Sequence, residues 1–183
     1  MAQTSYDPNG YMQYEPIQDY YYNQLTDDSL APRDVVGHLW FNILGEYLLI
    51  KEGFSLEAQP RECKQSDDIS IRYVKKGIKT PLTLVGNKRV SLERSDTTWA
   101  DAVTQLTRSM KLARTASNTA NEDMFGIVTV GHYSRFYVLH PHDQMLTDHQ
   151  ATGGKDLEFA RDETEIVSLI LSIKDQALRP SSS

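Results

Sequence analysis

The chain has 183 residues, a net charge of −6 at pH 7 and a mean hydropathy of −0.49. That length is enough for one folded domain, and the acidic balance argues against a protein that coats nucleic acid without specificity. The single cysteine, Cys63, excludes an intramolecular disulfide and favours a reducing compartment, so we expect an intracellular protein of the nucleus or cytoplasm. The sequence shows neither an N-terminal secretory pattern nor an apolar run of about 18 residues, so we expect no membrane partner.

Charge is distributed unevenly along the chain. Residues 61–114 hold 12 Lys and Arg against 6 Asp and Glu, a net charge of +6, whereas the remainder holds 7 against 19, a net charge of −12. A basic centre inside an acidic chain indicates a face that binds DNA or RNA. The alternative is that the opposite charges simply disperse over the folded surface.

Residues 1–30 are rich in tyrosine, asparagine and glutamine and poor in aliphatic residues. Neither the strand period nor the helix period persists there. A segment of this kind buries too little apolar surface to offset the entropy of ordering, so the sequence predicts a disordered tail. The tyrosine-rich arm is also a candidate for binding a protein partner or for phosphorylation, and Tyr20–Leu25 is the stretch that could dock on the domain.

The predicted domain spans residues 31–178 and begins with a helix, while residues 179–183 form a C-terminal tail. Pro32 and Asp34 suit a first helical turn, and Gly53 suits the end. Apolar residues recur between them at helical spacing: Val36, Leu39, Trp40, Ile43, Tyr47 and Ile50. Glu46 lies beside this apolar face, either as a solvated residue or directed at a site.

Three strands are predicted next, over 54–58, 68–74 and 81–89. The second alternates clearly, and the third has the continuous apolar run of a central strand. The short basic turn between them favours antiparallel pairing, which would bring Asp68 near Lys88.

A long helix is predicted to follow, with its N-cap at Ser95 and Asp96. Its buried positions are Trp99, Ala102, Val103, Leu106, Met110 and Ala113. Strands over 125–130 and 135–139 read as a hairpin, and 163–178 as a final amphipathic helix. The order of elements predicts a mixed α/β fold, a sheet covered by helices.

The order α-β-β-β-α-β, together with two short motifs, resembles the PD-(D/E)xK nuclease superfamily, which has a restriction-endonuclease-like fold. The resemblance is to its small fungal members, in which a V-E-x-K-R strand precedes a helix with W-x-x-A-x-x-Q-L. This chain has VGNKR at 85–89 and WADAVTQL at 99–106. The similarity covers roughly residues 34–140, and its motifs are short.

The resemblance implies a Mg²⁺-dependent phosphodiester hydrolase. It implies that Asp68 binds the metal, that Lys88 is the catalytic lysine, and that Gln105 lies near the site. Glu46 matches the acid that many members carry on the first helix. Gly86 stands where a second metal-binding acid is expected, and glycine offers no ligand, so the resemblance implies a degraded metal site with weak or no catalysis.

Another acid could replace the missing one. Asp101 lies 13 residues after Lys88 and one helical turn before Gln105, and Glu93 in the preceding loop is a second candidate. The ordinary alternatives are a solvated Asp101, a surface Lys88 and a capping Asp68.

Three functions therefore stay open on the sequence. The first is a pseudoenzyme with a nuclease fold that binds nucleic acid or a protein partner. The second is an active Mg²⁺-dependent endonuclease that uses Asp101. The third is a scaffold protein that acts through its tyrosine-rich arm, since a fold does not fix a function.

Overall fold

The computed structural model describes residues 10–25, 35–58, 69–75, 78–117 and 121–179. Three long helices are present among them: α2 (Val35–Tyr47), α3 (Asp96–Ser117) and α4 (Glu163–Leu178). The strands are β1 (Phe54–Ala58), β2 (Ile69–Lys75), β3 (Ile78–Lys88), β4 (Met124–Val130), β5 (Tyr133–Leu139), β6 (Thr147–Asp148) and β7 (Leu157–Glu158). Short helical turns are η1 (Tyr11–Gln13), α1 (Glu15–Asp19), η2 (Tyr20–Gln24), η3 (Ile50–Glu52) and η4 (Val90–Leu92).

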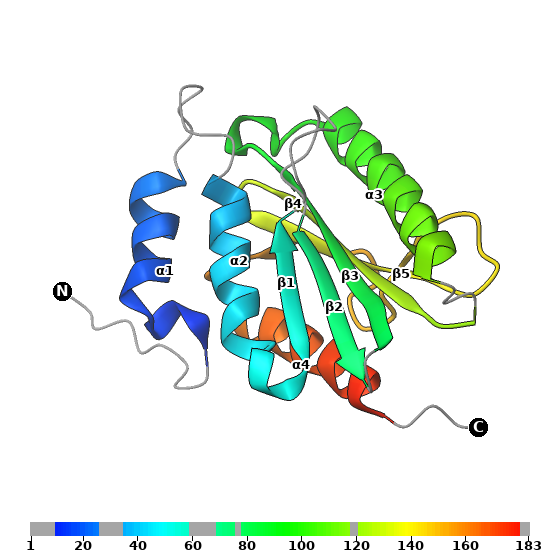
Figure 1. The fold of residues 1–183 in the computed structure, drawn as a ribbon. Helices are drawn as coiled ribbons and strands as arrows, with labels where there is room; N and C mark the ends of the chain where they lie inside the picture. Colours follow the sequence, from blue (N-terminus) through cyan, green and yellow to red (C-terminus); the bar gives the residue numbers. More distant parts are fainter. Residues whose placement is uncertain (1–9, 26–34, 59–68, 76–77, 118–120, 180–183) are drawn as a thin grey trace.

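The strands form one mixed sheet in the order β1-β2-β3-β4-β5-β6, with β7 also paired to β5. The first three strands are antiparallel neighbours, whereas β3 and β4 are parallel and α3 connects them. A parallel pair needs such a crossover, because a tight turn can join only antiparallel strands. The mixed α/β class predicted from the sequence is therefore confirmed (Figure 1).

Two separate hydrophobic cores cover the two faces of the sheet. The alternation of β4, which is buried along its whole length, divides them. Phe125 and Ile127 enter the core beneath α2 and α4, while Val128 and Val130 enter the core beneath α3. Helices on both faces leave a central strand such as β4 without a solvated side.

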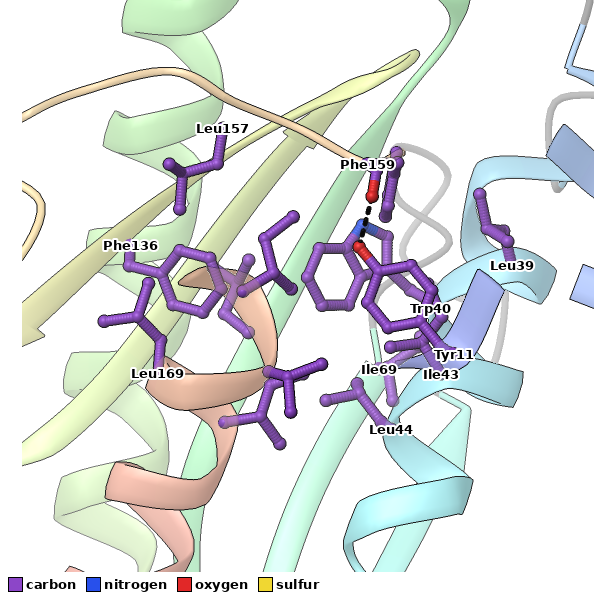
Figure 2. Close-up of a cluster of buried hydrophobic side chains, with 14 of the residues drawn as sticks. Tyr11, Leu39, Trp40, Ile43, Leu44, Ile69, Phe136, Leu157, Phe159 and Leu169 are labelled. Carbon is purple, nitrogen blue, oxygen red and sulfur yellow. Dashed lines mark hydrogen bonds between the residues drawn. The ribbon is translucent and has the colours of Figure 1, made fainter. Parts of the chain in front are cut away.

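The core beneath α2 and α4 is the larger and is drawn in Figure 2. Trp40 lies at its centre, with its ring centroid 5.2 Å from that of Phe159 and 6.2 Å from that of Phe136. Tyr11 packs into the same cluster, and its hydroxyl donates a 2.6 Å hydrogen bond to the backbone carbonyl of Phe159. This core therefore joins residues from the beginning, middle and end of the chain.

The prediction of a disordered tail through residue 30 is wrong for residues 10–25. These residues form three consecutive helical turns, and their apolar side chains are buried in the larger core: Tyr11, Met12, Ile17 and Leu25. Figure 1 shows α1 beside α2. The physical reason is that these four apolar side chains of the N-terminal segment, residues 10–25, pack into a cluster with side chains of distant elements, and this burial offsets the entropy of ordering.

The first predicted helix is shorter than its apolar spacing suggests. It ends at Tyr47, and Ile50, predicted on the buried face, is 86% exposed in η3. Gly53 has a φ of +97° and closes η3, so the glycine ends this short turn and not α2 itself. The predicted start at Pro32 and Asp34 lies outside the described residues.

The remaining predicted elements are found with small changes of boundary. The third strand begins at Ile78, earlier than the predicted residue 81, and Ser95 accepts a hydrogen bond from the Thr98 backbone N–H as the N-cap of α3. The β4–β5 hairpin has a two-residue turn, Gly131 and His132, in which glycine has a positive φ of 56°. In the described part of the chain, no helix is both long and apolar enough to cross a membrane.

Candidate functional site

The carboxyl ends of the parallel strands β3 and β4 meet at one edge of the sheet. Lys88 pairs with Val130, and the N–H of Gly131 donates a 3.0 Å hydrogen bond to the carbonyl of Lys88. In sheets with parallel strands, ligand sites lie beyond the carboxyl ends, where the connections to the helices begin. This edge, which we call the β3–β4 end, is the candidate site.

Lys88 and Gln105 are brought together at this end. The Lys88 ammonium donates a 2.9 Å hydrogen bond to Gln105 Oε1, and both side chains are half-buried. Gln105 lies on α3, which packs along β3 and β4. An amide oxygen holds the ammonium in place without neutralising it, so the positive charge remains available to an anion.

Of the predicted site positions Gly86 and Asp68, only Gly86 lies within the described residues. Gly86 is two positions before Lys88 on β3 and pairs with Val128 of β4. The antiparallel pairing of β2 with β3, predicted from the short turn, is confirmed, and Ile69 pairs with Val85. Asp68, which precedes Ile69, lies outside the described residues.

The two other predicted metal ligands, Glu46 and Asp101, lie on helices that cover opposite faces of the sheet. Glu46 is exposed on α2, which covers the other face of the sheet, and its carboxylate accepts a 2.7 Å hydrogen bond from the Tyr14 hydroxyl. That hydrogen bond raises the pKa of Tyr14. Asp101 is exposed on α3, one turn before Gln105.

The described residues do not provide a donor set that fits Mg²⁺. None of their His, Cys, Asp and Glu side chains gather in a group of three or more that could hold a metal ion. Mg²⁺ prefers several oxygen ligands in an octahedron, with carboxylates among them.

Arg135 is a second cation on the α3 face that the sequence reasoning missed. Its guanidinium carbon lies 4.2 Å from the centroid of the Trp99 ring, and it pairs with Asp156 through two hydrogen bonds. The Asp156 carboxylate raises the pKa of Arg135. Val128 of β4 pairs with Gly86 of β3 on one side and with Arg135 of β5 on the other. Arg135 therefore lies two strands from Gly86 in the same cross-strand row of residues.

Sequence reasoning also missed a histidine–carboxylate pair at the same end. Glu93 Oε1 lies 2.7 Å from His132 Nδ1 and accepts a 2.6 Å hydrogen bond from the His132 backbone N–H. The hydrogen bond to Glu93 raises the pKa of His132. The Gly131-His132 turn was visible in the sequence as a hairpin, but nothing local indicated that Glu93, 39 positions away, would meet it.

Comparisons of the chain with models of protein families, with curated proteins and with solved structures found no match.

Proposed function

We propose that this chain is a pseudoenzyme with a restriction-endonuclease-like fold, and that it binds the phosphate backbone of DNA or RNA at the β3–β4 end. The observation that carries the proposal is the 2.9 Å hydrogen bond between Lys88 and Gln105. Gly86 lies two positions before Lys88, where the motif has an acid. The order α2-β1-β2-β3-α3-β4 supports it, because the sequence resemblance implies that order.

Binding is favoured over cleavage by the chemistry of these groups. An oriented ammonium offsets phosphate charge, and each phosphate contact adds a salt-dependent contribution to affinity. Arg108 is exposed on α3, one turn beyond Gln105, and adds positive charge to this face of the helix. Gly86 supplies no carboxylate for a metal, so we expect weak or no hydrolysis.

The test is fluorescence anisotropy with single- and double-stranded oligonucleotides of DNA and RNA across a range of low salt concentrations. Lys88→Ala should weaken binding about tenfold and reduce the slope of log Kobs against log salt by about 1. Lys51→Ala is the matched control, because Lys51 is an exposed lysine in η3, before β1, at the other end of the sheet. Absence of binding at low salt, or equal losses in both variants, would exclude this site.

The second candidate is an active Mg²⁺-dependent endonuclease. The observation that favours it is the exposed position of Asp101 one turn before Gln105 on α3. With Mg²⁺ or Mn²⁺ present, Asp101→Asn and Lys88→Ala would then abolish cleavage of plasmid and single-stranded DNA equally. Cleavage that persists in Asp101→Asn rules the role of that acid out, while Gly86→Glu should raise Mg²⁺ affinity in calorimetry if Asp68 lies beside it.

The third candidate is a scaffold that binds a protein partner through the N-terminal tyrosines. Within residues 10–25, Tyr14 and Tyr22 are the exposed aromatic side chains, at 37% and 57%. Because Tyr11 is completely buried, it cannot serve that purpose in this conformation. Loss of a protein partner in Tyr22→Ala, without any nucleic-acid binding in the parent chain, would favour this function.

A further inference from the structure

Gly126 lies in the interior of β4, where the sequence MFGIVTV is otherwise rich in strand-forming residues and every position is buried. Glycine inside a strand is unfavourable, because it loses more conformational freedom on folding than other residues and offers no side chain to pack. Such a glycine often marks a place where another part of the molecule approaches the backbone closely. The position therefore has to be explained by what lies over it.

The element that lies over Gly126 is α3. A methyl group at this position would lie 2.9 Å from Leu106 Cδ2 and 2.9 Å from Met110 Sδ. Leu106 and Met110 are one turn apart on α3, and both belong to the core beneath that helix. Non-bonded carbon atoms pack at about 3.5 Å or more, so a methyl group would need roughly 0.6 Å of additional room, the difference between 3.5 Å and 2.9 Å.

The displacement would reach the helix itself. Leu106 and Met110 are both buried, and closely packed interiors transmit strain instead of absorbing it. A side chain at position 126 would therefore push α3 away from the sheet. Gln105 directly precedes Leu106 and would move with it.

The hydrogen bond of the candidate site depends on this distance. Gln105 Oε1 accepts from the Lys88 ammonium at 2.9 Å. A shift of roughly 0.6 Å would lengthen the contact toward 3.5 Å, beyond the range of about 2.7 to 3.2 Å that N–H···O hydrogen bonds prefer. The close packing of α3 on Gly126 thus keeps Gln105 within reach of Lys88.

We propose that Gly126 is a positioning residue of the β3–β4 end: its missing side chain sets the distance of α3 from the sheet and so places Gln105 on Lys88. The consequence for binding rests on the proposed function, in which Lys88 contacts phosphate. A lysine side chain has many rotamers, and holding its ammonium before the ligand arrives reduces the entropy lost on binding. Gly126 is buried beneath α3, so it acts on affinity without touching the ligand.

The experiment is a double-mutant cycle between Gly126→Ala and Gln105→Ala, measured by fluorescence anisotropy with the same oligonucleotides at low salt. Gln105→Ala should weaken binding about fivefold, the size expected for one hydrogen bond, and Gly126→Ala should weaken it by the same factor. Adding Gln105→Ala to Gly126→Ala should then cause no further loss. A merely structural role of the glycine would give losses that multiply, and multiplying losses or an unchanged affinity in Gly126→Ala would overturn the proposal.

A second measurement needs no ligand. The NMR chemical shifts of the Gln105 side-chain amide should change when Lys88→Ala removes the ammonium, and this change should vanish in the Gly126→Ala background. If it vanishes while the parent chain binds no nucleic acid, the positioning role stands and the proposed function fails. A change of equal size in both backgrounds overturns the positioning role.

Gly45→Ala is the matched control, because a methyl group at that position of α2 would meet Leu56 Cδ1 at 3.9 Å, an ordinary contact distance. It should leave both measurements unchanged.

Gly126→Ala combined with Leu106→Ala tests the contact from the helix side. Leu106→Ala vacates the space that the added methyl group needs, and the unbranched Met110 side chain can adapt. The combined variant should therefore fold and regain the effect of Lys88→Ala on the Gln105 amide. A combined variant that does not fold, or does not regain that effect, overturns the proposal, and this variant decides the result if Gly126→Ala alone does not fold.

Discussion

The cores on the two faces of the sheet differ in how far apart their residues lie in the sequence. Among the described side chains, the core beneath α3 runs from Trp99 to Leu146, so its parts are near neighbours in sequence. The core beneath α2 and α4 runs from Tyr11 to Ile173 and includes the N-terminal segment. The first face can form from local contacts, whereas the second requires the two ends of the chain to meet.

The candidate site and the larger core lie on different faces of the sheet. The β3–β4 end, with Lys88 and Gln105, belongs to the locally assembled face. His132 connects that end to the N-terminal segment, because its ring lies against Glu93, which precedes α3, and meets the Tyr21 ring edge-on with centroids 5.3 Å apart. Substitutions on the two faces should therefore have separable effects.

The largest effect on stability is expected from Trp40→Ala in the core beneath α2 and α4. Trp40 is completely buried against Phe159 and Phe136, so its removal leaves a cavity and should lower the free energy of unfolding by about 4 kcal/mol. Urea unfolding followed by circular dichroism measures the change. Phe41→Ala, at a 39% exposed position on the same helix, is the control and should lose less than about 1 kcal/mol. Equal losses would contradict the central place of Trp40.

A smaller loss is expected from Tyr11→Phe, which removes only the hydroxyl. The Phe159 carbonyl then loses its donor in a buried setting, so the free energy of unfolding should fall by about 1.5 kcal/mol. Tyr14→Phe removes an exposed hydrogen bond to Glu46 and should change stability by less than about 0.5 kcal/mol. If thermal unfolding cannot distinguish the two variants, the hydrogen bond of the Tyr11 hydroxyl does not contribute to stability.

Ser95→Ala probes the locally assembled face. The serine hydroxyl caps the first turn of α3 by accepting from the Thr98 N–H at 3.2 Å, so its loss should cost about 1 kcal/mol. Ser91→Ala, at an exposed position in η4, should change stability by less than about 0.5 kcal/mol in the same chemical denaturation. A larger loss from Ser91→Ala would show that the cap is not the relevant contact.

The smallest effect is expected from Ile50→Ala. Although helical spacing placed Ile50 on the buried face, it is 86% exposed, and its truncation should change the free energy of unfolding by less than about 0.5 kcal/mol. Ile43→Ala, from the same predicted face but completely buried, should lose about 3 kcal/mol. A comparable loss at Ile50 would show that α2 extends further than the structure describes.

Much of the candidate site could be expected from residues close together in sequence. Lys88 at the end of a strand and Gln105 on the next helix belong to one strand–helix crossover, and their contact follows from packing that helix against its own strands. The placements of Arg135 over Trp99 and of His132 beside Glu93 could not be predicted this way. Each depends on the register of β4 with β5 and on the position of a loop, neither of which leaves a periodic signal.

The sequence by itself determined the mixed α/β class, the sequential order of the main helices and strands, and the buried face of α3, because period and capping are local properties. Only the tertiary structure decided the fate of residues 10–25. Tyr11 and Leu25 are separated by polar residues that resemble a tail, and they become ordered because they are buried in one cluster with side chains of α2, α4 and Phe159. The free energy of that burial comes from partners more than 100 positions away, so no local pattern could have revealed it.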